Sequence, residues 1–172
     1  ALMISANWFM FIYSVQTGHA MQASLGYYIF PLVAVMLGFV LLGERLSAGK
    51  WAAVGLAAAA VGGLTWGLGV APWISLAIAF TFGFYGLLKK GSPAGPVVSV
   101  TTEVLLLSPL ALVWLWGVHA QGWEGLVGRN LGTFGHDLRD SLILAASGVL
   151  TGGPLVLFSY ASKRVSFATV GL

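Results

Sequence analysis

Glu103 is the side chain whose type and position favour chemistry most. Among the 8 Lys and Arg and 5 Asp and Glu residues, it alone lies inside a long apolar run. A carboxylate within the hydrocarbon of a membrane costs a few kcal/mol, so we expect Glu103 to face a cavity or a partner. It could bind a substrate ammonium group or exchange a proton. A structural role stays equally open, because Glu103 lies about 9 Å from the end of its run at 1.5 Å per residue. It could then snorkel to the interface or hydrogen-bond Ser99.

Four further side chains inside apolar runs are candidates for a binding site. Asn7 and Ser14 are seven residues apart and so share one face of a helix. In lipid an amide needs a partner, so Asn7 either bonds a neighbouring helix, worth about 0.6 to 2 kcal/mol, or lines a cavity. Tyr28 and Tyr85 lie about a turn inside their runs. They could line an aromatic cavity or join the interfacial belt, where we expect Tyr13.

The residue types that most enzymes need are missing or badly placed. The chain has no cysteine, which excludes disulfides and thiolate metal sites. His19, His119 and His136 lie outside the centres of the apolar runs, and neither an HExxH nor a GxSxG pattern occurs. We therefore expect no catalytic residue, no cofactor and no metal. The net charge of +3 is not gathered on a basic face with aromatics, so nucleic acid is not an expected partner.

Long apolar segments must position these side chains. The 172 residues are 58% hydrophobic and 8% charged, with a mean hydropathy of +0.92, which is typical of a membrane protein. About twenty apolar residues cross a bilayer as one helix. We predict six helices over residues 1–16, 25–42, 51–66, 72–88, 97–118 and 141–161, and a seventh that begins near 165. The runs are apolar all round without an alternation of period two, so the predicted fold is all-α, a polytopic transmembrane helical bundle.

Charge predicts how this bundle is oriented. The loops at 43–50, 89–96 and 162–165 hold six of the eight Lys and Arg residues, whereas the opposite loops hold only Arg129 and Arg139. By the positive-inside rule, the first three loops are expected to be cytoplasmic in a multi-pass protein of the cell inner membrane.

The first of these loops also carries turn signals. Gly43 is expected to cap the helix before it, and Ser47 to begin the next. Glu44 and Arg45 are expected to anchor the turn, with pairing across an interface or gate as the alternative.

A short internal repeat is visible when the chain is shifted by 145 positions. It aligns residues 23–26 (Ala-Ser-Leu-Gly) with 168–171 (Ala-Thr-Val-Gly), and Ser14 with Ser159. The shift superposes the first predicted helix on the sixth. A shift of five helices places the two copies in opposite orientations, which is the inverted repeat of many secondary transporters.

Longer motifs carry a family resemblance. They are Asn7-Trp8, Gly18-His19, residues 23–28 (Ala-Ser-Leu-Gly-Tyr-Tyr), Leu42-Gly43-Glu44-Arg45-Leu46, residues 82–90 (Phe-Gly-Phe-Tyr-Gly-Leu-Leu-Lys-Lys), Glu103 with Pro109, and residues 167–172 (Phe-Ala-Thr-Val-Gly-Leu). Together they resemble the RarD-type permeases of the EamA group in the drug/metabolite transporter superfamily. Phe30 and Gln22 depart from that group, which usually has Asn and Glu at these positions.

The resemblance implies an architecture and an activity. The architecture is a ten-helix inverted-repeat transporter, of which this chain is a fragment of about seven helices. Residues 1–66 would end the first EamA-like repeat and 72–172 would begin the second. Chain ends inside apolar runs also predict a fragment. The implied activity is that of a permease linked by name to chloramphenicol sensitivity.

We expect a permease that exports small organic solutes, such as amino acids, metabolites or drugs, by alternating access. A channel or a non-transporting membrane scaffold is the alternative. Pro31, Pro109 and Pro154 are expected to interrupt their helices and could serve as hinges. The expected partners are the lipid bilayer and a small-molecule solute, and a homodimer stays open.

Overall fold

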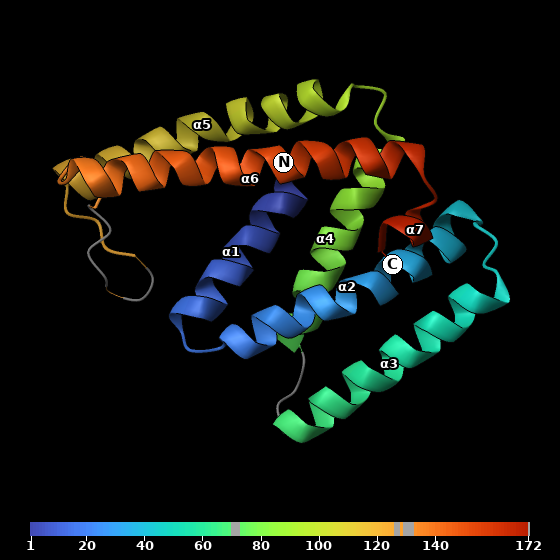
Figure 1. Ribbon diagram of the computed structural model, residues 1–172. Helices are drawn as coiled ribbons and strands as arrows, with labels where there is room; N and C mark the ends of the chain where they lie inside the picture. Colours follow the sequence, from blue (N-terminus) through green and yellow to red (C-terminus); the bar gives the residue numbers. More distant parts are fainter. Residues whose placement is uncertain (70–72, 126–127, 129–132, 172) are drawn as a thin grey trace. The chain divides into compact units, whose positions relative to one another are not determined.

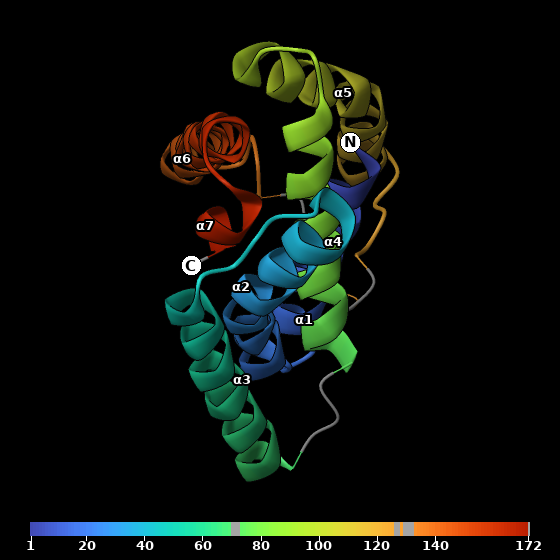
Figure 2. The same ribbon diagram turned by 90° about the vertical axis from the view of Figure 1, so that its right-hand side faces the viewer.

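A computed structural model describes residues 1–69, 73–125, 128 and 133–171, in which every regular element is a helix (Figures 1 and 2). The prediction of an all-α fold is confirmed. The chain forms two compact units. The larger unit consists of Leu2–Ser92 and Ala161–Leu172, and the smaller unit consists of Pro93–Tyr160 and Ala1.

The helices follow the predicted runs in order. They are α1 (Leu2–Gln16), α2 (Ala20–Leu42), α3 (Ala48–Leu68), α4 (Trp73–Gly91), α5 (Pro96–Ala120), α6 (Leu138–Arg164) and the short α7 (Phe167–Gly171). The one clear difference is the start of α2, which was expected at residue 25. Gly18, with φ 83°, reverses the chain before it, and Ala23 is fully buried. Packing of this first turn extends the helix beyond the apolar run.

The turn between α2 and α3 is built as predicted. Gly43 ends α2 in the left-handed conformation, with φ 64°. The Glu44 N–H donates to the Gly38 carbonyl at 3.0 Å, which satisfies one of the last carbonyls of the helix. Ser47 begins α3, where its Oγ accepts a hydrogen bond from the Lys50 N–H at 3.4 Å.

In the larger unit, α2 packs against α1, α3, α4 and α7 (Figure 1). Its most extensive contact is with α4, and this contact depends on glycine. A Cβ atom at Gly26 would lie 2.9 Å from the Ser75 carbonyl oxygen, and one at Gly83 would lie 2.8 Å from Val33 Cγ1. The two helices therefore pack with backbone against side chain, as small residues allow in membrane proteins.

Prolines lie inside three helices without ending them. Pro31, Pro109 and Pro154 are interior residues of α2, α5 and α6, which continue past them. The helices are therefore not broken at these residues, although each proline lacks the backbone N–H that would bond the preceding turn. A kink or hinge at these positions stays a prediction. Near Pro31 the chain also packs closely, because a Cβ atom at Gly171 of α7 would lie 3.0 Å from the Pro31 carbonyl oxygen.

In the smaller unit, the segment after α5 folds back onto that helix. The Trp123 ring covers Gly117 so closely that a Cβ atom there would collide with it. The Trp123 N–H donates to the Gly117 carbonyl at 3.1 Å. The last turn of α5 is thus covered, whereas apolar side chains such as Leu105 and Leu142 are exposed along α5 and α6.

Three of the described helices, α2, α5 and α6, are each long and apolar enough to cross a membrane. From the apolar runs we predict six crossings. In α4, Lys89 and Lys90 in the last turn lower the mean hydropathy.

Candidate functional site

Asn7 and Ser14 both lie on the buried side of α1. Asn7 is 1% exposed. Its Nδ2 donates to the Ile78 carbonyl at 2.8 Å and to Thr81 Oγ1 at 3.0 Å, both on α4. Ser14 Oγ donates within its own helix, to the Met10 carbonyl at 2.6 Å. Asn7 therefore joins two helices, whereas contact of either side chain with a solute stays a prediction.

A second polar contact joins α2 and α4. Ser75 Oγ donates to the Gln22 carbonyl at 2.6 Å. The Gln22 side chain is also buried, and its Oε1 has no hydrogen-bond partner in the described part of the chain. A buried amide oxygen without a partner is costly. The side-chain oxygen of Gln22 is therefore available to accept a further hydrogen bond inside the larger unit.

Five aromatic side chains from α1, α2 and α4 form a connected group, which we call the aromatic row. Its members are Phe11, Tyr27, Phe30, Phe82 and Tyr85. The Phe82 ring lies 6.2 Å from Tyr27, 4.9 Å from Phe30 and 6.0 Å from Tyr85, and the Phe11 ring lies 5.7 Å from Tyr27. Tyr27 is 41% exposed and Tyr85 only 2%, so the row leads from the surface of the unit into its interior.

Lys89 lies at the buried end of the aromatic row. It is 2% exposed, and its Nζ lies 5.1 Å from the centroid of the Tyr85 ring, as in a cation–π contact. From the sequence, Lys89 is expected only as a charge that sets orientation. The spacing of Phe82, Tyr85 and Lys89 is the signal that could have found this face, since residues three and four apart lie together on a helix.

The other predicted site residues lie apart from this row. Tyr28 is on α2 but 68% exposed. Glu103 belongs to the smaller unit, where its side chain is 17% exposed. Of the five predicted side chains, the larger unit therefore buries Asn7, Ser14 and Tyr85, and only Tyr85 belongs to the row.

A second group of polar contacts gathers where α2 and α4 end and α7 begins. We call it the charged cluster, and it comprises Glu44, Lys50, Lys90 and Lys163. Glu44 Oε1 accepts a hydrogen bond from the Phe167 N–H at 2.6 Å, and Oε2 accepts one from the Ala168 N–H at 2.9 Å. Lys90 Nζ lies 3.8 Å from Glu44 Oε1. Glu44 thus pairs with distant segments, which was the alternative to its anchoring only its own turn.

Two lysines of the cluster each bond the end of the helix that carries the other lysine. Lys90, at the end of α4, donates to the carbonyls of Ser162 at 3.3 Å and Val165 at 2.7 Å near the end of α6. Lys163, at the end of α6, donates to the Ser92 carbonyl just beyond α4 at 2.8 Å. Each cation thus bonds carbonyls at the other helix end, where the helix dipole favours positive charge.

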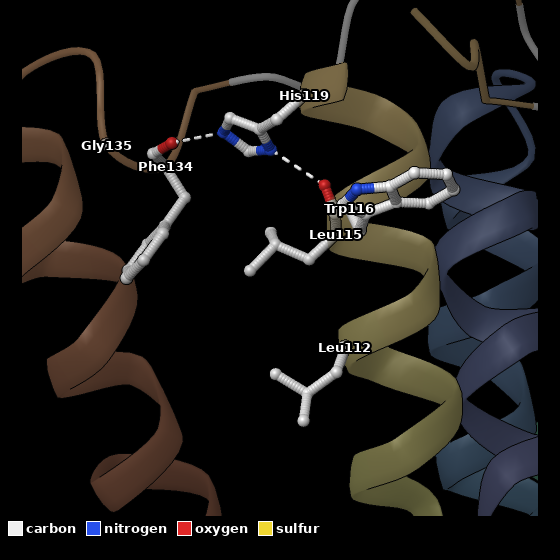
Figure 3. A pocket seen from close by; sticks show the side chains of 6 residues that line it. All are labelled: Leu112, Leu115, Trp116, His119, Phe134 and Gly135. Carbon is white, nitrogen blue, oxygen red and sulfur yellow. Dashed lines mark hydrogen bonds between the residues drawn. The ribbon is translucent and has the colours of Figure 1, made fainter. Parts of the chain in front are cut away.

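The smaller unit holds an open cavity of about 370 Å³ at the end of α5 (Figure 3). Its lining is mostly apolar: Leu112, Leu115, Trp116, His119, Phe134 and Gly135. Figure 3 shows His119 between two carbonyl oxygens, with Nδ1 2.9 Å from that of Leu115 and Nε2 2.5 Å from that of Phe134. The cavity contains none of the predicted site residues.

Comparison with known proteins shows what the chain is related to. The EamA-like transporter family matches residues 1–66. An uncharacterized transporter of Pseudomonas aeruginosa is 43% identical over 170 residues, which cover 99% of this chain and 55% of the relative. Protein RarD of Streptomyces exfoliatus is 42% identical over 172 residues (100% and 52%), and protein RarD of Escherichia coli is 36% identical over 171 (99% and 55%). No solved structure matches the chain significantly.

The predicted family resemblance is therefore confirmed. The chain spans about half the length of the curated relatives it matches, and the similarity extends over nearly all of its residues. The chain belongs to the RarD-type group of the EamA-like transporter family.

Proposed function

We propose that the full-length protein is a permease of the cell inner membrane that exports small organic solutes by alternating access. The observation that carries this proposal is identity of 36–43% over nearly the whole chain with proteins named as transporters or as RarD. Family membership alone does not set the substrate. The solute class therefore has to be argued from the side chains of the larger unit.

The aromatic row favours solutes with an aromatic or apolar part. Tyr27 and Phe82 combine ring surface with partial exposure, and binding sites for small molecules are lined mostly by such side chains with a few polar groups. We propose that Asn7, Ser14 and Tyr85 border the solute path in the larger unit, with Tyr28 at its mouth. Glu103 would be the coupling or binding carboxylate in the smaller unit.

In the proposed permease, two inverted repeats would form the two halves that move against each other. We propose that residues 1–66 end the first repeat and that 72–172 begin the second. The aligned positions have matching surroundings, because Ala23 and Ala168 are both fully buried. Gly26 and Gly171 each lie where a Cβ atom would come within 3.0 Å of a neighbouring helix. Such matching supports a common origin of the two segments.

The charged cluster supports the proposed orientation. Its contacts join the three basic loops, since Glu44 of the first lies near Lys90 of the second and near Phe167, just after the third. Loops that touch one another lie on one side of a membrane. The positive-inside rule then favours the cytoplasm for residues 43–50, 89–96 and 162–165.

The proposal is tested on the full-length protein in detergent and in proteoliposomes. A thermal-shift screen against amino acids, aromatic metabolites and chloramphenicol identifies a ligand, and flux of that ligand is then measured with and without a proton gradient. Saturable, gradient-dependent efflux is expected. Flux that does not saturate would indicate a channel, and no binding or flux of any panel member would contradict the proposed function.

A matched pair of tyrosine variants tests the site. Tyr85→Leu removes a buried ring of the aromatic row, whereas the control Tyr13→Leu removes an exposed ring on α1 that is outside the row and the proposed path. The ligand concentration that gives half of the full thermal shift should rise about two- to tenfold for Tyr85→Leu, because an aromatic pair contributes about 0.5 to 1.5 kcal/mol. Equal effects of the two substitutions would contradict the placement of the solute path along the row.

A further inference from the structure

Glu44 makes a bidentate contact across a long stretch of sequence. Its two carboxylate oxygens accept hydrogen bonds from the N–H groups of Phe167 and Ala168, which are 123 and 124 residues away. These groups are among the first N–H donors of α7, which have no partner within the helix. A carboxylate at this position forms charge-assisted hydrogen bonds and complements the helix dipole.

The end of α2 is shaped to hold this carboxylate. A Cβ atom at Gly38 would lie 2.8 Å from Glu44 Oε2 and 3.3 Å from the Ala168 nitrogen. Any larger side chain at position 38 would therefore push the carboxylate away from α7. The backbone is held as well, because the Glu44 N–H donates to the Gly38 carbonyl at 3.0 Å.

Two lysines reinforce the same contact. Lys90 lies 3.8 Å from Glu44 Oε1 and also donates to the Val165 carbonyl at 2.7 Å. Lys50 donates to Thr169 Oγ1 of α7 at 2.9 Å. The Glu44 side chain is only 14% exposed, so this pairing is shielded from water more than an ordinary surface ion pair, which contributes little.

We infer that Glu44 is a latch between the two proposed repeats. Glu44 and Lys50 belong to residues 1–66, and α7 and Lys90 belong to 72–172, so the contact crosses from one repeat to the other. The latch holds the cytoplasmic side of the permease closed and has to release before that side can open. This inference rests on the proposed function, because only alternating access requires the two repeats to separate there.

The test measures opening directly in the full-length protein with natural cysteines replaced. Nitroxide labels are attached to cysteines at positions 49 and 91, one in each proposed repeat. Both positions are exposed glycines, and nothing lies within 4 Å of an added Cβ atom. Distances between the labels and the hydrogen exchange of residues 165–171 are compared for Glu44→Gln and Gly38→Ala. Glu124→Gln and Gly62→Ala are the matched controls, because Glu124 is exposed and an added Cβ atom at Gly62 has open space.

Both latch variants should populate a longer label distance and exchange the amides of residues 165–171 about tenfold faster, as expected when charge-assisted hydrogen bonds are lost. Exchange in residues 74–86 of α4 should stay unchanged, which shows that the fold is intact. If Glu44→Gln fails to fold, Gly38→Ala carries the test. Unchanged label distances in a folded latch variant would overturn the latch, even if exchange in α7 rises, since Glu44 would then be a static cap.

Flux separates the two proposals. If the unaltered protein transports no panel solute while the variants still open, the proposed function fails and the opening role of Glu44 stands. If the unaltered protein transports and the variants keep its label distances, the latch alone fails.

Discussion

Individual polar side chains of this chain differ in whether they bond a neighbouring helix or their own helix. Asn7 donates both to a backbone carbonyl and to a hydroxyl of α4, whereas the hydroxyl of Ser14, on the same side of α1, donates within its own helix. Hydrogen bonds between helices in membranes contribute modestly, about 0.6 kcal/mol on average and up to about 1.7. The difference between Asn7 and Ser14 should nevertheless be measurable.

Removing the Asn7 amide is expected to weaken the contact between α1 and α4. Asn7→Ala should lower the free energy of unfolding by about 1 to 2 kcal/mol, and Ser14→Ala by less than about 0.5 kcal/mol. Unfolding by denaturing detergent in mixed micelles would measure both. A double-mutant cycle with Thr81→Val should give a coupling of about 0.6 kcal/mol, and strict additivity would exclude a direct interaction between Asn7 and Thr81.

Two roles are open for Glu103: coupling of transport to a proton gradient, and a structural contact. If it couples transport to a proton gradient, Glu103→Gln in the full-length protein should reduce gradient-driven flux at least about tenfold while expression stays normal. Glu124→Gln is the matched control, since it removes an exposed carboxylate of the same unit. Normal proton dependence of flux in Glu103→Gln would reduce Glu103 to a structural residue.

At the scale of elements, α2 organises the larger unit. It contacts four other helices, and it does so with little polar surface of its own. Glycines set the distance between α2 and α4: Gly26 on one helix and Gly83 on the other each lie against the partner. In lipid, where apolar surface alone gives no preference for a protein neighbour, such close packing is a main source of helix association.

An added methyl group should therefore have opposite effects on α2 and α3. Gly26→Ala would place its Cβ atom 2.9 Å from a backbone oxygen of α4, and such overpacking costs about 1 to 3 kcal/mol. Gly55→Ala in α3 meets open space and should stabilise the helix by up to about 1 kcal/mol. The midpoints of thermal unfolding of both variants in detergent measure this difference. Equal midpoints would contradict the packing described for α2 and α4.

At the scale of the whole molecule, the charged cluster ties together loops that are far apart in sequence. Contacts run from the α2–α3 turn to the end of α4 and to the start of α7. A bundle threaded back and forth through a membrane brings every second loop to the same side. The contacts of the cluster thus join the same loops that the charge asymmetry in the sequence predicts to lie on one side of the membrane.

Cysteine labelling in intact cells tests this arrangement. Single cysteines that replace Gly49 or Gly91 should react only with a reagent that crosses the membrane. A cysteine that replaces Gln121 should react with an impermeant reagent added outside the cell. All three positions are exposed, so lack of reaction would reflect sidedness rather than burial. Positions 49 and 91 on different sides would contradict the proposed orientation and the inverted-repeat architecture with it.

Local patterns along the chain suffice to predict the helices, their order, most of their ends and the family. Apolar runs, turn glycines and loop charges act locally, and each helix forms from residues close together in the chain. The glycine at position 43 and the serine at 47 act where they were predicted, because caps depend on the adjacent backbone.

Only the tertiary structure decided which side chains share surroundings. Periodicity could not separate Tyr85, which is buried, from Tyr28, which is exposed, nor show that Lys89 lies over a ring. It also could not find a partner for Glu44 that lies 123 residues away. Such contacts depend on which faces of distant helices meet, and that is set by packing among all of them rather than by any one segment.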